Sequence, residues 1–350
     1  MLGFGVTTVM VAVEFLEVGL STLTKAAINK GMSDFVFIVY TNAFAASFIL
    51  LPSTLLYYRK RSRPLLTVSI VSRIFLLGLI GCCVQTFMIT GIGFSSPTLS
   101  SAITNLTPAF TFILAIISRM EKLNLKLQSS LAKSIGTMVS IAGALTVTLF
   151  KGPEVVTTSS PYNLRDEILL AHTNWLIGGL LLTAGSFSLS LLYIVQTSIV
   201  KDYPEELMVT FICCVFVTLQ SAILALILEG DPNAWRLKPG MELMAILYSA
   251  VFAVALRTLV HTWACHKKGP VYVSMFKPLG IVIAMVMGVT FLGDTLYVGS
   301  VVGAVIIAFG FYSVMWGQTR EEKMADYEGM DSLRPSSPKI PLLQNSSMEA

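Results

Sequence analysis

Residues 206–228 read ELMVTFICCVFVTLQSAILALIL, and no side chain between Glu206 and Glu229 carries a charge. A helix needs about 20 predominantly apolar residues to cross the hydrocarbon core of a bilayer. This stretch has that length and that composition, so it predicts a membrane-spanning helix.

The same apolar character extends over the whole chain. Of the 350 residues, 54% are hydrophobic and 13% are charged, and the mean hydropathy is +0.75. Soluble domains carry roughly 25% charged residues, so a water-soluble enzyme of this length is excluded. The net charge of +4 and the scattered basic residues argue against a nucleic-acid surface. Hydropathy predicts ten spans, at residues 5–25, 35–58, 72–93, 98–118, 131–150, 174–197, 206–228, 242–264, 271–292 and 296–316.

The distribution of Lys and Arg over the predicted connections indicates the orientation of the chain. With a cytosolic N-terminus, fourteen of these residues lie on the cytosolic side and six on the opposite side. The positive-inside rule therefore places both termini in the cytosol. The first span is not followed by a small-residue cleavage pattern, so it is expected to be a retained helix and not a signal peptide.

The two halves of the chain carry a similar pattern. In each half a proline early in the fourth span precedes an acid and then two glycines seven residues apart, namely Pro108, Glu121, Gly136 and Gly143 against Pro278, Asp294, Gly303 and Gly310. Glycines two turns apart on one helix face allow another helix to approach closely. Because five spans is an odd number, the second half enters the membrane inverted, as in many transporters with a midplane substrate site. A chance pattern in Gly-rich membrane helices is the alternative.

The predicted fold class is therefore an all-α polytopic membrane protein, with ten transmembrane helices in two inverted five-helix repeats. The first repeat covers 1–151 and the second covers 174–317. An extracytosolic connection, 152–173, joins the repeats. Residues 318–350 are predicted to form a polar, disordered cytosolic tail.

Several local motifs occur together along the chain. They include Ser96-Pro97-Thr98, Asn105-Leu106-Thr107-Pro108-Ala109-Phe110, Met120-Glu121-Lys122-Leu123, Lys268-Gly269-Pro270-Val271 and Met315-Trp316-Gly317. In combination they resemble the plant nodulin-21-like, or Walls-Are-Thin-related, group of the drug/metabolite transporter superfamily. The resemblance implies two EamA-type domains and export or bidirectional movement of amino acids or related metabolites, with auxin as one substrate attributed to the group. Thr41 and Lys277 stand where commoner members have Arg and Asn.

Ionisable residues inside predicted spans are the mechanistic candidates, because a charge near the centre of a span costs roughly 2.5–3.5 kcal/mol. Glu14 and Glu17 lie three residues apart on the first span and share one helix face. Two carboxyl groups this close do not both ionise readily in a low dielectric, which suits proton-coupled exchange. A structural pairing with a buried cation, Lys277 or Arg257, is the alternative.

Lys277 directly precedes Pro278, where the hydrogen-bond ladder of the helix is interrupted. Its ammonium group is expected to meet a substrate carboxylate, or to neutralise Glu14 or Glu17 when the site is empty.

Arg257, His261 and Trp263 form a second group of candidates on the eighth span. His261 follows Arg257 by one turn, and Arg257 either contacts substrate or extends to the membrane interface.

Asn42, Gln85 and Asn105 are neutral amides in the second, third and fourth spans. In a midplane cavity they would supply donors and acceptors for a zwitterionic substrate. Hydrogen bonding between helices is the alternative role.

Five cysteines lie in apolar stretches, at positions 82, 83, 213, 214 and 265. Their spacing is that of neither zinc ligands nor a disulfide framework, so they are interpreted as small residues of the core or the lipid-facing surface. Three isolated histidines make a metal site improbable, and no cofactor is expected.

These observations favour a transporter of amino acids or related small metabolites, with a small-molecule substrate and the lipid bilayer as partners. An auxin or other aromatic-acid exporter, at the vacuolar membrane, is the alternative within that class. A lipid-modifying enzyme would need a His-rich box, an Asp-rich motif or a nucleophile beside a base, and none occurs. A passive channel or receptor-like scaffold would differ by lacking saturable flux. The plasma membrane is the expected location, and nothing in the sequence indicates an oligomeric state.

Overall fold

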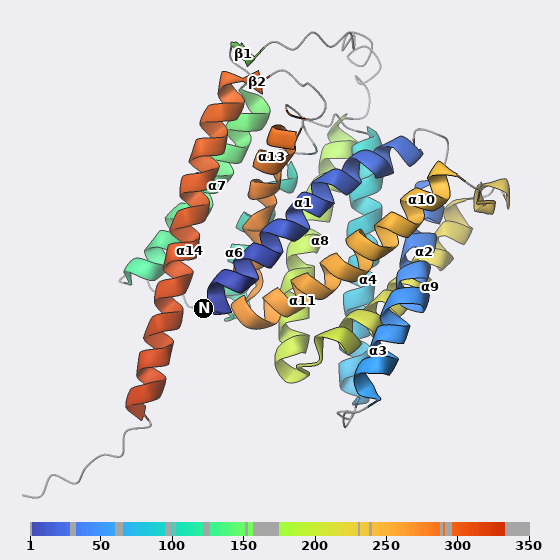
Figure 1. The fold of residues 1–350 in the computed structure, drawn as a ribbon, viewed down its shortest axis with the longest axis horizontal. Coiled ribbons are helices and arrows are strands. Elements are labelled where there is room, and N and C mark those ends of the chain that lie inside the picture. Colours follow the sequence, from blue (N-terminus) through green and yellow to red (C-terminus); the bar gives the residue numbers. More distant parts are fainter. Residues whose placement is uncertain are drawn as a thin grey trace, which may run out of the picture.

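The protein is a bundle of long helices, seen in a computed structural model (Figure 1). The structure describes residues 2–28, 33–59, 66–94, 100, 103–121, 127–150, 153–156, 175–229, 232–237, 240–287, 290 and 296–332. A backbone in hydrocarbon must satisfy its polar groups internally, and helices do so within one segment. The apolar sequence therefore folds into helices almost throughout.

The helices of the first half are α1 (Leu2–Ile28), α2 (Asp34–Phe44), α3 (Leu51–Tyr58), α4 (Val68–Phe94), α6 (Thr107–Ile117) and α7 (Gln128–Leu149). Those of the second half are α8 (Trp175–Asp202), α9 (Glu206–Leu228), α10 (Met241–Tyr248), α11 (Arg257–Lys268), α12 (Pro270–Ser274), α13 (Phe276–Met287) and α14 (Val298–Ser332). A short 3₁₀ helix, η2 (Pro232–Trp235), follows α9.

Within the described residues, eight helical segments are long and apolar enough to cross a membrane. They are Asp34–Tyr57, Val68–Ile92, Gln128–Leu149, Leu176–Asp202, Glu206–Leu228, Glu242–Lys268, Pro270–Met287 and Val298–Glu321. Eight of the ten predicted spans coincide with these segments. The other two predicted spans fall on α1 and, in part, on the 11-residue apolar helix α6. The count of ten and the inverted arrangement stay predictions.

Two spans change their winding partway through the membrane. A π-helical segment, η1 (Ala45–Leu50), joins α2 to α3, and a second one, η3 (Ser249–Leu256), joins α10 to α11. The two π-helical segments pack on each other through small side chains, among them Ala45, Ala250 and Ala255. Such wide turns are frequent at functional sites.

The predicted glycine faces bring α7 and α14 together along one edge of the bundle (Figure 1). A Cβ atom on Gly136 would lie 2.8 Å from the carbonyl oxygen of Gly310, and one on Gly143 would lie 2.9 Å from that of Gly303. The expected close approach is confirmed. Because contacts advance along α7 as they recede along α14, the two helices run antiparallel.

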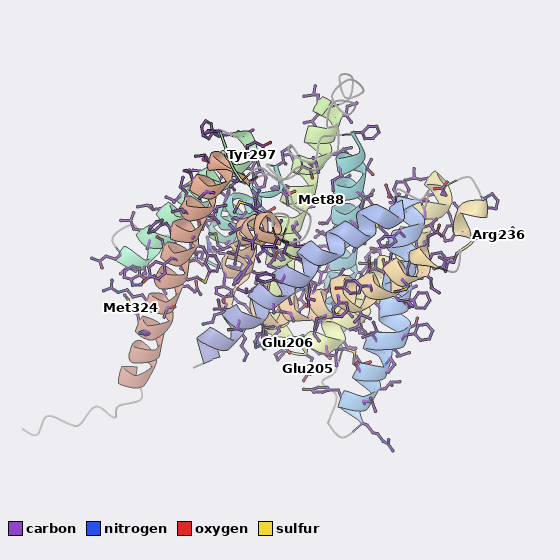
Figure 2. All side chains as sticks on the ribbon, turned by 45° about the horizontal axis from the view of Figure 1, so that its top comes forward. Met88, Glu205, Glu206, Arg236, Tyr297 and Met324 are labelled. Atoms are coloured by element: carbon purple, nitrogen blue, oxygen red, sulfur yellow. The ribbon has the colours of Figure 1, made fainter. Side chains whose placement is uncertain are left out.

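The segments beside this helix pair meet in a small two-stranded sheet, which the all-α prediction does not include. Strand β1 (Glu154–Val156) pairs antiparallel with β2 (Leu296–Tyr297), and Glu154 lies opposite Tyr297. Tyr297 and Glu206 lie at opposite ends of the bundle (Figure 2). The sheet therefore ties the start of α14 to the end of α7 on the face away from Glu206.

Helix α14 is longer than the sequence predicts. It continues to Ser332, so residues 318–332, assigned above to a disordered tail, are helical. Residues 333–350 lie outside the described residues. Near the start of α7, Lys133 is fully buried and pairs with Glu121 and with Glu321 of the α14 extension. This pairing gives the extension a contact with the bundle.

Candidate functional site

Four charged side chains from three helices meet inside the bundle. The Lys277 ammonium on α13 lies 3.0 and 2.9 Å from the two carboxylate oxygens of Glu17 on α1. Arg257, the first residue of α11, donates to Glu17 Oε1 over 3.0 Å. Glu14, one turn before Glu17, has its Oε1 3.6 Å from Lys277 Nζ. We call these residues, Glu14, Glu17, Arg257 and Lys277, the charged cluster.

The charged cluster is neutral as a whole, with two acids and two bases. Glu14 is the most deeply buried of its members, at 3% exposure. A Cβ atom on Gly280 would lie 3.1 Å from Glu14 Oε2, so the absence of a side chain there leaves room for the carboxylate. Mutual neutralisation is the condition under which charged groups are tolerated at membrane depth.

Both cations lie where a helix is irregular. Lys277 follows the turn at Met275 that separates α12 from α13, and Pro278 next to it has no backbone N–H. Arg257 follows directly on the π-helical segment η3. The predicted interruption of the ladder before Pro278 is confirmed. At these two breaks, Lys277 and Arg257 both contact Glu17 inside the bundle.

A cavity of about 90 Å³ opens beside the charged cluster. Its polar lining consists mainly of Asn42, Gln85, Tyr193, Gln196, Arg257 and His261, and most of its other lining residues are apolar. Ligand sites for drug-sized molecules are usually about 300–1,000 Å³, so this cavity suits the polar head of a small metabolite.

Two of the predicted amides line this cavity and bond directly to each other. Asn42 on α2 donates from Nδ2 to Gln85 Oε1 on α4 over 3.1 Å, and also to the Ile38 carbonyl oxygen over 2.8 Å. The bond joins α2 to α4, as expected of an interhelical contact, while both side chains also line the cavity. The interhelical bond is therefore present, and the contact with a zwitterionic substrate stays a prediction.

Two predicted residues lie elsewhere. Asn105 is buried in the turn before α6, and the residues that line the cavity do not include it. Trp263 is partly buried against the apolar cluster that contains Val6, Met10 and Phe276, and it does not line the cavity either. Trp263 follows His261 by two positions on a helix, which turns the two side chains to different faces.

The sequence prediction omits Tyr193 and Gln196 of α8. The Tyr193 ring packs edge-on against the His261 ring, with centroids 5.8 Å apart. Gln196 is 3% exposed and donates from Nε2 to Thr262 Oγ1 on α11 over 2.5 Å. An amide inside an apolar span is the signal that singles out Gln85, and the same signal applies to Gln196.

The described residues hold no group of three or more His, Cys, Asp or Glu side chains that could bind a metal ion. The five cysteines are free thiols, and Cys213 and Cys214 line the cavity.

Comparison with known proteins agrees with this architecture. The sequence model of the EamA-like transporter family matches residues 176–316. One solved crystal structure superposes with a TM-score of 0.67 at 13% identity, covering 91% of this chain and 99% of the other. At that identity the likeness shows the fold alone. Together with the membrane-spanning helices, the family match points to a multi-pass membrane transporter.

Relatives of known name narrow the class further. One WAT1-related protein of Arabidopsis thaliana is 46% identical over 97% of this chain and 95% of its own length. A second is 47% identical, covering 90% of this chain and 88% of its own length. A third is 44% identical over 92% of this chain. The chain belongs to the WAT1-related family of plant EamA transporters.

Proposed function

We propose that this chain transports amino acids or related small organic metabolites by alternating access between two inverted five-helix repeats, 1–151 and 174–317. The observation that carries the proposal is the charged cluster beside a polar cavity, at a depth where a bilayer otherwise excludes charge. The antiparallel packing of α7 on α14, the last helix of each repeat, supports the inverted arrangement. Helices α1 and α6 would complete the ten spans, with both termini in the cytosol.

The proposed mechanism is an exchange of partners within the charged cluster. A substrate carboxylate replaces Glu17 as the partner of Arg257 and Lys277, the two cations that hold Glu17 at 3.0 Å or less. A monocarboxylate that displaces Glu17 is balanced when an acid of the cluster takes up one proton, whereas a zwitterionic amino acid has no net charge and is balanced without that proton. The empty site is neutral by internal pairing, and the loaded site is neutral through the substrate. Either state can therefore turn toward the other face of the membrane.

Efflux from oocytes preloaded with labelled amino acids, one at a time, tests this proposal. Saturable release is expected, with a rate that differs between acidic and neutral external pH. Glu17→Gln and Lys277→Ala should abolish release while surface expression persists. Asp202→Asn is the matched control, because its pair with Arg73 is a half-exposed ion pair outside the cavity. Wild-type release in both cluster variants would contradict the role given to these residues.

The second candidate is an auxin or other aromatic-acid exporter at the vacuolar membrane. The observation that favours it is the Tyr193 ring in the same cavity lining as Arg257, since an aromatic carboxylic acid needs both a ring surface and a cation. Release of labelled indole-3-acetate without release of any amino acid would select this function. A fluorescent C-terminal fusion in plant cells distinguishes the two locations. We propose the plasma membrane, and fluorescence at the vacuolar membrane would favour the second candidate.

A further inference from the structure

The hydrogen bonds around Thr262 fix the orientation of the Gln196 amide. Thr262 Oγ1 donates its single hydrogen to the Thr258 carbonyl oxygen over 2.7 Å. Toward Gln196 it can therefore only accept, and Gln196 Nε2 must be the donor in their 2.5 Å contact. The Gln196 amide oxygen consequently points away from Thr262. It is buried and has no hydrogen-bond partner among the described residues.

A second buried polar atom, on another residue of the same cavity lining, also has no partner among the described residues. His261 is 6% exposed, and its Nε2 makes no hydrogen bond within the described part of the chain. Both side chains line the cavity that Arg257 also lines. A buried polar atom left unpaired costs about 1–3 kcal/mol. Gln196 and His261 are the two residues of this lining that carry such an atom, so a ligand that reaches both would remove that cost.

We propose that Gln196 Oε1 and His261 Nε2, with the imidazole proton on Nδ1 so that Nε2 accepts, form the amino-group subsite of the transport cavity, which receives the ammonium group of an amino acid while its carboxylate pairs with Arg257. This inference rests on the proposed function and deepens it, because it assigns the orientation of the substrate. Gln196, with an unpaired acceptor, and Arg257, with a cation, are both among the lining residues. A zwitterion matches both, and its charge-assisted bonds are stronger than neutral ones.

The subsite has a consequence for selectivity. A desamino acid, which keeps the carboxylate and side chain of the amino acid but lacks its amino group, leaves Gln196 Oε1 unpaired. Sites built to hydrogen-bond a polar group discriminate against analogues that lack it. The wild-type chain should therefore bind the amino acid more tightly than its desamino acid.

The test uses the labelled amino acid with the greatest wild-type flux in the oocyte panel, with the matching desamino acid as unlabelled competitor. Gln196→Met removes the acceptor at similar side-chain length. It should raise the KM of the amino acid about tenfold and leave the inhibition constant of the desamino acid unchanged. Gln220→Met is the matched control, since Gln220 Oε1 is likewise buried without a partner but lies outside this cavity. It should change neither constant.

A second variant keeps the inference testable if Gln196→Met fails to reach the membrane. Gln196→Glu retains an acceptor but cannot donate to Thr262, so it separates ligand binding from the structural bond. It should keep amino-acid flux and weaken inhibition by the desamino acid. Equal changes for both ligands in whichever variant reaches the membrane would overturn the subsite and leave the transporter function intact. Absence of any amino-acid flux in the wild-type chain would instead overturn the proposed function.

Discussion

Removing the carboxylate of Glu17 while both of its cations remain is the sharpest probe of the charged cluster. In the wild-type chain two acids balance two bases, all within a few ångströms. Glu17→Gln leaves Arg257 and Lys277 against Glu14 alone, and Lys277→Met leaves two acids against one base. The double variant restores neutrality with Glu14 and Arg257. The double variant is therefore expected to lose less unfolding free energy than the sum of the losses in the two single variants.

The exposed fractions set the magnitude. Removing one partner of a buried pair costs about 3–5 kcal/mol, because it leaves an uncompensated charge. The Lys277 and Glu17 side chains are 11% and 28% exposed, so partial solvation places each single variant near the low end, about 3 kcal/mol. The double variant should recover about 2 kcal/mol of the summed loss as a coupling energy.

Unfolding of the purified full chain in mixed micelles, followed through its four tryptophans, measures these free energies. The matched control is the cycle Arg73→Met and Asp202→Asn, whose side chains are 48% and 57% exposed. A pair so exposed should couple by about 0.2–1 kcal/mol. A coupling energy between Glu17 and Lys277 no larger than that of the control pair would refute the view that these charges depend on each other.

Three further outcomes are expected. Gly310→Ala should lose about 1–3 kcal/mol of unfolding free energy, since its Cβ would lie 2.5 Å from the Ser140 amide nitrogen. The control Gly5→Ala, where the Cβ would meet open space, should not lose stability in the same unfolding assay. Lys133→Met should lose about 3 kcal/mol, because two carboxylates share this one buried cation, and unchanged thermal unfolding would contradict that pairing. Asn42→Leu should raise the substrate KM about tenfold in efflux assays, and a lower maximal rate at constant KM would point to a packing role alone.

The charged residues of the site could be predicted from the sequence because hydrophobicity makes them conspicuous. An acid or base in a run of apolar residues needs a partner, and only Lys277 and Arg257 are available to Glu14 and Glu17 at membrane depth. What the sequence leaves open is which cation meets which acid. The structure gives Glu17 both cations and leaves Glu14 beside Lys277. That choice depends on the rotation of three helices, which no local pattern encodes.

Neutral polar residues are harder to place, because any helix face can use an amide for packing. Asn105, like Asn42, is an amide within a predicted apolar span, yet it is buried in a turn outside the cavity. Gln196 is such an amide too, and lies inside. The difference arises from which helix faces meet, and the π-helical segments η1 and η3 shift those faces without a Gly or Pro signal within them.

The extent of α14 shows the same limit at a helix end. Residues 318–332 are polar enough to predict disorder, but they continue helix α14 and pair with a buried lysine of another helix. Lys133 counts as one more cytosolic cation when the sequence is read alone. In the structure it is 1% exposed and takes Glu321 from the α14 extension as a partner. A contact with a distant helix of this kind cannot be inferred from the local composition of the tail.

The charged cluster and the Lys133 cluster, both within the described residues, differ in a way that bears on transport. The Lys133 cluster pairs one base with two acids at helix ends, outside the polar cavity. The charged cluster pairs two bases with two acids next to a polar cavity, where Arg257 contacts both Glu17 and the cavity space. A substrate carboxylate can compete at the second, because there an ion-paired cation also lines a polar cavity. Arg257 pairs with Glu17 in the empty site and also lines the cavity. A substrate carboxylate should therefore replace Glu17 at Arg257 first and at Lys277 second.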